Sequence, residues 1–284
     1  MHEKNTPSDN YALKRAPAET RRLQAQAQIL NPSTRRMFEQ AGITAGMRVL
    51  DVGSGAGDVA LLLADMVGSS GTVTGIEIDP SILYTARARV EAAGFTNVSF
   101  LAGDIASMQL ETEFDAIVGR LIFIHLRSSV AILQQLATHL RPGGIVAFQE
   151  FDLAHFATTP VHPPNQLIEQ ICTWNVEAFR RAGLPIRTGL DLYTLFLDAG
   201  LPAPQMSGEA TIIAGPDWAG YDWAAETIRT VLPLILKFGL ATAEEVQIET
   251  LAERMRHESL NHRLVSRGPD IISAWTRKPV LSNE

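Results

Sequence analysis

Residues 49–64 read VLDVGSGAGDVALLLA, an apolar run that enters a glycine turn and leaves it as a helix-like run. The turn contains Gly53, Gly55 and Gly57, three glycines within five residues. Glycine removes the side chain where a backbone must turn sharply, and it lets a ligand approach main-chain N–H groups closely. A strand, a glycine-rich turn and a helix in this order are typical of nucleotide-cofactor sites, although some such turns only reverse the chain.

The next predicted strand ends in an acid. Residues 71–80 read GTVTGIEIDP, and Glu77 lies where a carboxylate can accept both hydroxyls of a ribose. Asp79 and Pro80 then fit the N-cap and the first residue of a helix. Such a βαβ unit binds an adenosine-type ribose at the carboxyl edge of its sheet, which leaves both NAD and S-adenosylmethionine open at this point.

The spacing of the glycines and the third strand separate these two cofactors. The glycines follow GxGxG rather than GxGxxG, and Asp51 precedes them, where a carboxylate suits a cationic amino group but not a pyrophosphate. Residues 98–105, VSFLAGDI, predict a strand that ends in Asp104. This carboxylate could accept a hydrogen bond from an adenine amine while Ile78 and Ile105 sandwich the ring. The pattern therefore favours S-adenosylmethionine.

Two further strands and a tail complete the pattern. Residues 114–126, FDAIVGRLIFIHL, predict the fourth strand with its loop, and residues 140–150, LRPGGIVAFQE, predict the fifth. The ordered set over residues 47–150 resembles the class I S-adenosylmethionine-dependent methyltransferases of the small-molecule type, and residues 269–279 look like their last strand. The resemblance implies a Rossmann-like α/β fold: a seven-stranded, mostly parallel sheet with an antiparallel last strand, helices on both faces and a helical lid.

The resemblance also assigns roles to residues at the strand ends. It implies that Asp51 and Gly53 hold the methionine portion and that Glu77 binds the ribose. The backbone carbonyl of Arg120, after the fourth strand, suits the methionine ammonium. The implied cofactor-binding set is Asp51, Gly53, Ser54, Gly55, Gly57, Glu77, Ile78, Asp104, Ile105, Arg120 and Tyr11.

The chain outside these strands is expected to cover the site. Residues 1–40 predict an N-terminal cap segment with one helix from Ala18, stopped at Asn31 and Pro32, and a second helix from Ser33. Residues 41–284 form the methyltransferase domain, with a sixth strand at 204–215. Insertions at about 155–190 and 216–267 resemble the lids of small-molecule methyltransferases, where closure excludes water and aligns the acceptor.

His125 and Glu150 are the candidates for a catalytic base. Methyl transfer to a nitrogen, thiolate or acidic carbon needs only positioning, whereas a poorly acidic hydroxyl needs a base. The position of His125 favours a backbone-bonded helix cap over a base. Glu150 is also interpreted as an anchor for a cationic acceptor or as a solvated edge carboxylate. Aromatic residues after the fifth strand line an apolar acceptor pocket, form a cage around a cation or belong to a core; they are Trp174, Phe179, Trp218, Tyr221 and Trp223.

Composition restricts the partners. A formal charge of −7 and an acidic pI near 5.5 argue against a nucleic-acid partner. No apolar run of membrane-spanning length and no signal core is seen, so we expect a cytoplasmic protein without a membrane partner. Cys172 is the single cysteine, and no histidine spacing suggests a metal. We expect a small-molecule acceptor and consider a homodimer possible.

Three alternatives remain at this stage. One is a protein that binds S-adenosylmethionine without transferring its methyl group, for example a cyclase. Another is an NAD-dependent oxidoreductase, which Asp51 and the glycine spacing disfavour. The third is a non-catalytic subunit that retains the fold.

Overall fold

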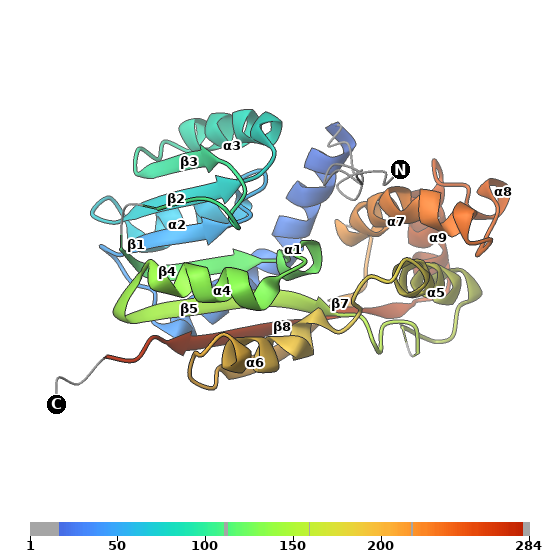
Figure 1. Cartoon of the computed structure of the whole chain (residues 1–284). Coiled ribbons are helices and arrows are strands. Elements are labelled where there is room, and N and C mark those ends of the chain that lie inside the picture. Colours follow the sequence, from blue (N-terminus) through green and yellow to red (C-terminus); the bar gives the residue numbers. More distant parts are fainter. Residues whose placement is uncertain (1–16, 111–112, 159, 217, 281–284) are drawn as a thin grey trace, which may run out of the picture.

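One sheet with helices packed on it forms the centre of the molecule (Figure 1). The computed structural model describes residues 17–110, 113–158, 160–216 and 218–280. The strands are hydrogen-bonded in the order β3-β2-β1-β4-β5-β8-β6, and β7 also pairs with β8. No helix in these ranges is long and apolar enough to cross a membrane.

Five parallel strands lie within residues 48–152, and a helix follows the first, second and fourth of them. The order in which strands and helices follow one another explains this, because a parallel neighbour needs a crossover connection. The elements are β1 (Arg48–Val52), α2 (Asp58–Val67), β2 (Thr72–Glu77), α3 (Pro80–Ala92), β3 (Val98–Ala102), β4 (Phe114–Arg120), the 3₁₀ turn η2 (Phe123–His125), α4 (Ser129–Thr138) and β5 (Leu140–Asp152).

The last long strand, β8 (Val265–Arg277), runs antiparallel between β5 and β7 (Gln205–Ile213). The expected mostly parallel, Rossmann-like sheet with an antiparallel last strand is thus confirmed. The sheet has an eighth strand, β6 (Val161–His162), beyond the seven expected. β8 starts beyond the end of β5, so the edge of its first residues, Val265 and Ser266, is available for β6 to pair with.

Two apolar cores lie on opposite faces of the sheet because successive residues of a strand point to opposite sides. Val49 of β1 belongs to the core built with α1 (Pro17–Ala41), α2 and α3. Leu50 and Val52 belong to the core built with α4 and α6 (Thr188–Asp198).

The N-terminal helix α1 is continuous from Pro17 to Ala41 and contains Pro32. The expected break at Asn31 and Pro32 is therefore wrong. Proline removes one backbone donor from a helix, here the N–H that would bond to the Gln28 carbonyl. The Ser33 hydroxyl donates to the Leu30 carbonyl at 2.9 Å, and Oγ1 of Thr34 lies 3.0 Å from the same carbonyl oxygen. Tertiary contacts from the strand ends, described below, hold this part of the helix in place.

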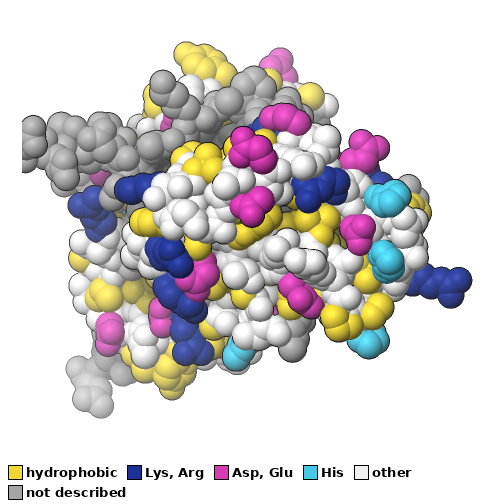
Figure 2. Space-filling model, turned by 90° about the vertical axis from the view of Figure 1, so that its right-hand side faces the viewer, with side chains coloured by type: hydrophobic (Ala, Val, Ile, Leu, Met, Phe, Trp, Pro, Cys, Tyr) yellow, Lys and Arg dark blue, Asp and Glu magenta, His cyan; other side chains and the backbone are white. Residues whose placement is uncertain are grey.

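Four helices form a separate group at the end of the molecule where β8 begins (Figure 1). They pack around a third apolar core, and all of them fall in the two stretches expected to be lid insertions. On the surface of this end of the molecule, acidic and basic side chains are interspersed (Figure 2). We call this group the lid helices: α5 (Gln166–Arg181), α7 (Gly220–Lys237), α8 (Ala243–Val246) and α9 (Leu251–Asn261).

Candidate functional site

The glycine turn between β1 and α2 has a backbone that favours glycine. Gly53, Gly55 and Gly57 have φ values of 72°, 51° and 83°, in the left-handed region that other residues rarely adopt. The N–H groups of Gly53 and Ser54 both donate to the Ile76 carbonyl at 2.9 Å. A Cβ at position 53 would lie 2.5 Å from Cδ1 of Ile122. The turn is therefore packed closely against the loop that follows β4.

Two buried polar atoms at this turn have no hydrogen-bond partner among the described residues. They are Oδ2 of Asp51, a residue 1% exposed, and Oγ of Ser54, a residue 5% exposed. Buried polar atoms are nearly always paired, and an unpaired one costs free energy. A carboxylate and a hydroxyl beside a glycine turn suit a ligand that offers an ammonium and other polar groups. The residues present thus fit S-adenosylmethionine.

Burial dominates the electrostatics of Asp51. It raises the pKa of this carboxyl to about 7, against the attraction of Arg120, while the charges of Glu77 and Asp58 push the pKa further up. An isolated buried carboxylate is unfavourable. A cationic ligand group at this position would favour the ionised form of Asp51 and pair with it.

Glu77 is buried at the end of β2 and holds two backbone segments together. Its Oε2 accepts from the Gly55 N–H and its Oε1 from the Asp79 N–H, both at 3.0 Å. Asp79 in turn caps α3 by accepting from the Ser81 N–H at 2.9 Å. Glu77 therefore connects the glycine turn to the start of α3, and its role toward a ribose stays a prediction.

The three residues expected around an adenine ring have different environments. Ile78 is 48% exposed, and Asp104 is exposed, with Oδ1 accepting from the Ala106 N–H at 2.9 Å. Ile105 is buried in the core beneath α4. The Gly103 N–H donates to the Glu77 carbonyl at 2.9 Å, so these residues meet at one edge of the sheet. Their contact with a ligand stays a prediction.

The guanidinium of Arg120 contacts the N-terminal helix. Its Nη1 donates to Oδ1 of Asn31 at 2.9 Å and lies 3.0 Å from Oγ1 of Thr34. Burial lowers the pKa of Arg120, and the negative charges of Asp58 and Asp51 act against this lowering. The role of the Arg120 carbonyl in binding the cofactor stays a prediction, whereas its side chain is hydrogen-bonded to α1.

Arg120 belongs to a larger buried network. The single hydroxyl proton of Thr34 is within reach of Oε1 of Gln149 at 2.7 Å and of the Leu30 carbonyl at 3.0 Å. Nε2 of Gln149 donates to the Ser273 and Ser33 hydroxyls at 2.9 and 3.3 Å. The sequence reasoning missed this network, although a glutamine inside the apolar strand IVAFQEF was a signal of it. We call the set the α1 anchor: Asn31, Ser33, Thr34, Arg120, Gln149 and Ser273.

Glu150 is 1% exposed and holds the loop after β4. Its Oε1 accepts from the N–H groups of Ile122 and Phe123 at 2.7 and 2.8 Å, just past Leu121, whose φ is 56°. Burial raises the pKa of Glu150 to about 8, and these two hydrogen bonds oppose the rise. This geometry favours a positioning role over that of a base. His125 is exposed at the end of η2, and its role as a base also stays a prediction.

Asp152 is a further buried acid that the sequence reasoning did not single out. It ends β5, is 4% exposed and accepts from the Ala154 N–H at 3.0 Å through Oδ1, while Oδ2 has no partner among the described residues. It follows Glu150 by two residues and so points to the same side of the strand. Tyr11, the remaining predicted cofactor contact, lies outside the described residues.

A small apolar cavity of about 40 Å³ lies among the lid helices. Trp218, Tyr221 and Trp223 line it, whereas Trp174 and Phe179 belong to the lid core without lining the cavity. Cys172 also lines it, and burial raises the pKa of this thiol to about 12.

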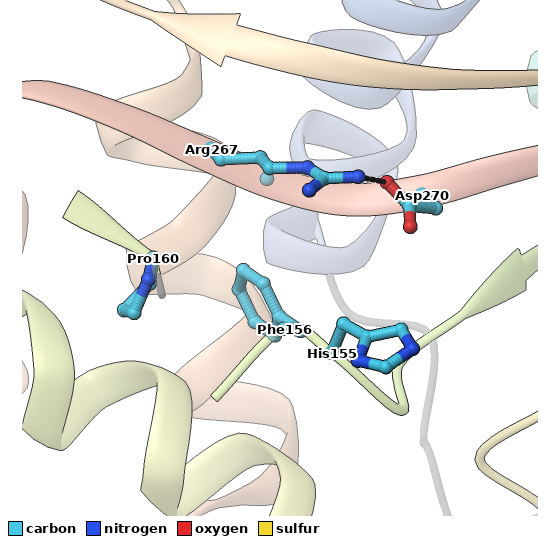
Figure 3. Close-up of a pocket in the computed structure, with 6 residues that line it drawn as sticks. His155, Phe156, Pro160, Arg267 and Asp270 are labelled. Carbon is cyan, nitrogen blue, oxygen red and sulfur yellow. Dashed lines mark hydrogen bonds and ion pairs between the residues drawn. The ribbon is translucent and has the colours of Figure 1, made fainter. Parts of the chain in front are cut away.

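The cavity adjoins the end of the sheet and a second pocket. The Trp223 ring lies 6.0 Å from that of Phe151, the residue after Glu150. Phe156 and Arg267 line both the cavity and a small pocket beside it, where Arg267 pairs with Asp270 at 2.5 Å and His155 lies opposite (Figure 3).

The chain is similar to known proteins in sequence and in fold. A family model described as a methyltransferase domain matches residues 43–200, more than half of the chain. Among curated proteins, an aklanonic acid methyltransferase (DauC) from Streptomyces is 32% identical over 138 residues, or 48% of this chain and 62% of that protein. An arsenite methyltransferase from Aquipseudomonas alcaligenes is 33% identical over 43% of this chain and 39% of that protein. A ubiquinone/menaquinone biosynthesis C-methyltransferase (UbiE) from Coxiella burnetii is 31% identical over 39% of this chain and 46% of that protein.

Solved structures share the fold over a larger part of the chain. A Bacillus halodurans protein described as a candidate methyltransferase superposes with a TM-score of 0.56 at 18% identity, over 86% of this chain and 97% of that one. The 4+2 cyclase SpnF superposes with a TM-score of 0.52 at 20% identity, over 89% and 83%. These likenesses concern the fold, whereas the family model matches the sequence itself. The chain belongs to the methyltransferase-domain family.

Proposed function

We propose that the protein transfers a methyl group from S-adenosylmethionine to a small apolar acceptor held under the lid helices. The observation that carries this proposal is the pair of buried, unpartnered atoms at the glycine turn, Oδ2 of Asp51 and Oγ of Ser54. In a chain of the methyltransferase-domain family, a buried carboxylate at that position is suited to the ammonium of the cofactor's methionine portion.

The chain contributes mainly binding and alignment. S-adenosylmethionine, when bound, supplies an electrophilic methyl group on a sulfonium. Displacement requires the nucleophile in line with that carbon at roughly 3 Å. Asp51 and Ser54 would hold the methionine portion, Glu77 keeps the glycine turn in shape, and Glu150 fixes the loop after β4. The lid helices would exclude water from the acceptor.

The lid cavity indicates an apolar acceptor. Its walls are mainly aromatic and aliphatic side chains, including Trp218, Tyr221 and Trp223. At about 40 Å³ it is far below the roughly 300 Å³ or more typical of ligand pockets, so the lid helices must separate to admit an acceptor. Relatives are named for aklanonic acid and for ubiquinone and menaquinone biosynthesis, and an acceptor of that aromatic or quinone-like kind fits such walls.

Arsenite, the substrate for which another relative is named, fits less well. Arsenic(III) binds thiolates, and the thiolate is the form of cysteine that acts as a ligand. The chain has a single cysteine, Cys172, and burial keeps it a neutral thiol with a pKa of about 12.

A second candidate keeps the cofactor site but uses it without methyl transfer, to promote a cyclisation. The observation that favours this candidate is the fold likeness to the 4+2 cyclase SpnF. The two candidates differ in their products, because only methyl transfer converts S-adenosylmethionine to S-adenosylhomocysteine in proportion to acceptor consumed.

The test of the cofactor needs no knowledge of the acceptor. We expect calorimetric titration to give micromolar binding of S-adenosylmethionine and S-adenosylhomocysteine and no binding of NAD. The Ser54→Ala variant should bind both sulfur ligands more weakly, whereas Ser70→Ala, at an exposed serine in the next loop, should bind them as the wild type does. Binding of NAD alone would contradict the proposal.

A variant that fills the lid cavity tests the acceptor site. Ala224 lines the cavity, and Ala224→Leu adds three carbon atoms there. We expect unchanged affinity for S-adenosylhomocysteine and a loss of at least tenfold in turnover of aromatic acceptors, measured by mass spectrometry of methylated products. Unchanged turnover would place the acceptor elsewhere.

A further inference from the structure

The α1 anchor joins three parts of the fold at one buried point. Arg120 comes from the end of β4, Gln149 from β5, and Thr34 from α1. Thr34 and Gln149 are fully buried, and their side chains are 2.7 Å apart. Buried hydrogen-bond networks of this kind are rigid, because an unpaired member would be costly. The middle of α1 is therefore fixed relative to the strand ends that carry the cofactor site.

The same helix contacts the lid. α1 packs against α7, and the two helices lie side by side in Figure 1. Nε1 of Trp223 in α7 donates to Oε1 of Gln26 in α1 at 3.4 Å, and both residues are buried. Trp223 lines the lid cavity and contacts Phe151. A displacement of α1 would therefore move one wall of the cavity.

The anchor also interacts electrostatically with the glycine turn. Arg120 is attracted to Asp51 and Asp58. Asp58 already pairs with Arg89 at 2.6 Å, whereas Oδ2 of Asp51 has no hydrogen-bond partner among the residues the structure describes. Geometry joins the two as well: Gly119, directly before Arg120, pairs with Val52, directly before Gly53, and a Cβ at Gly53 would lie 2.5 Å from Cδ1 of Ile122. A ligand on the glycine turn would therefore lie against the strand end that carries Arg120.

We propose that Arg120 is a positioning residue that couples the cofactor site to the lid through α1. This inference rests on the proposed function. A cofactor on the glycine turn packs against the loop that follows Arg120 and so restrains Arg120, the α1 anchor and α1. Through Gln26 and Trp223 it then orders α7. The acceptor cavity becomes fully formed only when the cofactor is in place, so the cofactor binds before the acceptor.

Hydrogen exchange with S-adenosylhomocysteine as the probe tests the coupling. In the wild type we expect the ligand to slow exchange at residues 53–57 and also in α7. Thr34→Val keeps the shape of the side chain but removes the hydroxyl that contacts Arg120 and Gln149. We expect residues 53–57 to remain protected by the ligand in this variant, while the ligand-dependent protection of α7 falls about tenfold, as expected for the loss of one buried hydrogen bond.

Thr227→Val is the matched control. Oγ1 of Thr34 and Oγ1 of Thr227 each lie within hydrogen-bond distance of a carbonyl four residues earlier, at 3.0 and 2.8 Å, but only Thr34 also contacts the strand ends. Thr34→Ser restores the hydroxyl and should restore the protection of α7. Asn31→Ala removes the other α1 partner of Arg120 and should have the same effect as Thr34→Val. It replaces Thr34→Val in the test if Thr34→Val does not fold.

The outcomes separate the two proposals. If the ligand fails to protect residues 53–57 of the wild type, the proposed function is wrong and the coupling falls with it. If it protects residues 53–57 but not α7, or if Thr34→Val behaves like Thr227→Val, the coupling alone is wrong.

Discussion

At the scale of single residues, two buried acids carry pKa values far above their ordinary range. The pKa of Glu150 is about 8 and that of Asp51 about 7, in both cases mainly because burial disfavours the charge. The folded protein therefore holds protons on these groups near neutral pH that the unfolded chain has lost. Such a group stabilises the fold less as the pH rises from its unfolded to its folded pKa.

Glu150 allows a direct test of this effect. We expect the free energy of unfolding to fall between about pH 5 and pH 8, and Glu150→Gln to reduce that slope. The amide keeps an oxygen for the Ile122 and Phe123 N–H groups but does not titrate. The reduction should reach up to about 1.4 kcal/mol per pH unit, the value for one proton. Urea unfolding at several pH values measures it, and parallel slopes would contradict the assignment.

Glu77 is the residue on which ribose binding is predicted to depend. We expect Glu77→Ala to weaken S-adenosylhomocysteine binding by about 1 to 3 kcal/mol, the loss typical of a charge-assisted partner. It also frees the N–H groups of Gly55 and Asp79, so thermal stability should fall as well. Asp65→Ala removes an exposed acid paired with Arg35 and serves as the calorimetric control. Unchanged affinity would exclude Glu77 from the site.

At the scale of elements, the glycine turn requires glycine at position 53 for two reasons, its positive φ and its close packing against Ile122. Gly53 and Gly94 have similar φ values, 72° and 77°, but only a Cβ at Gly53 would meet a neighbour, Ile122, at 2.5 Å. In both Gly53→Ala and Gly94→Ala, backbone strain should lower the free energy of unfolding by about 1 kcal/mol.

Gly53→Ala should lower the free energy of unfolding by more than Gly94→Ala does, because its Cβ also meets Ile122. It should also bind S-adenosylhomocysteine more weakly. The difference between the two melting curves isolates the contact with Ile122. Equal losses and intact ligand binding would mean that the loop after β4 can move aside.

The elements also show what the sequence could and could not predict. The strands other than β6, the glycine turn and the acids at the strand ends were predictable, because apolar runs with glycine breaks are local signals. The continuity of α1 through Pro32 was not, since Arg120 and Gln149, which hold it, are about 90 and 115 residues distant. The position of Glu150 on two backbone N–H groups likewise exists only once the loop has folded.

At the scale of the whole molecule, the lid helices and the sheet share a strand. Val265 and Ser266 of β8 pair with β6 near the lid, while Asp270 to Arg277 pair with β5. We expect the lid and the sheet to unfold in one transition, so that near-UV and far-UV circular dichroism melt together.

A saturating ligand should shift both signals equally. At about 100 times its Kd, S-adenosylhomocysteine adds about 2.7 kcal/mol to the free energy of unfolding, which raises the melting temperature by several degrees. If the near-UV signal melts at a lower temperature than the far-UV signal and the ligand does not shift it, the lid is an independent folding unit.

The place of β8 between β5 and β7 has a consequence for biosynthesis. Until residues 265–277 have left the ribosome, β5 presents a bare, apolar edge to which a foreign strand can add. The nascent chain can assemble its glycine turn and parallel strands early, but it carries this aggregation hazard until β8 has emerged. Premature stop codons before position 265 should therefore yield inclusion bodies rather than a smaller working protein.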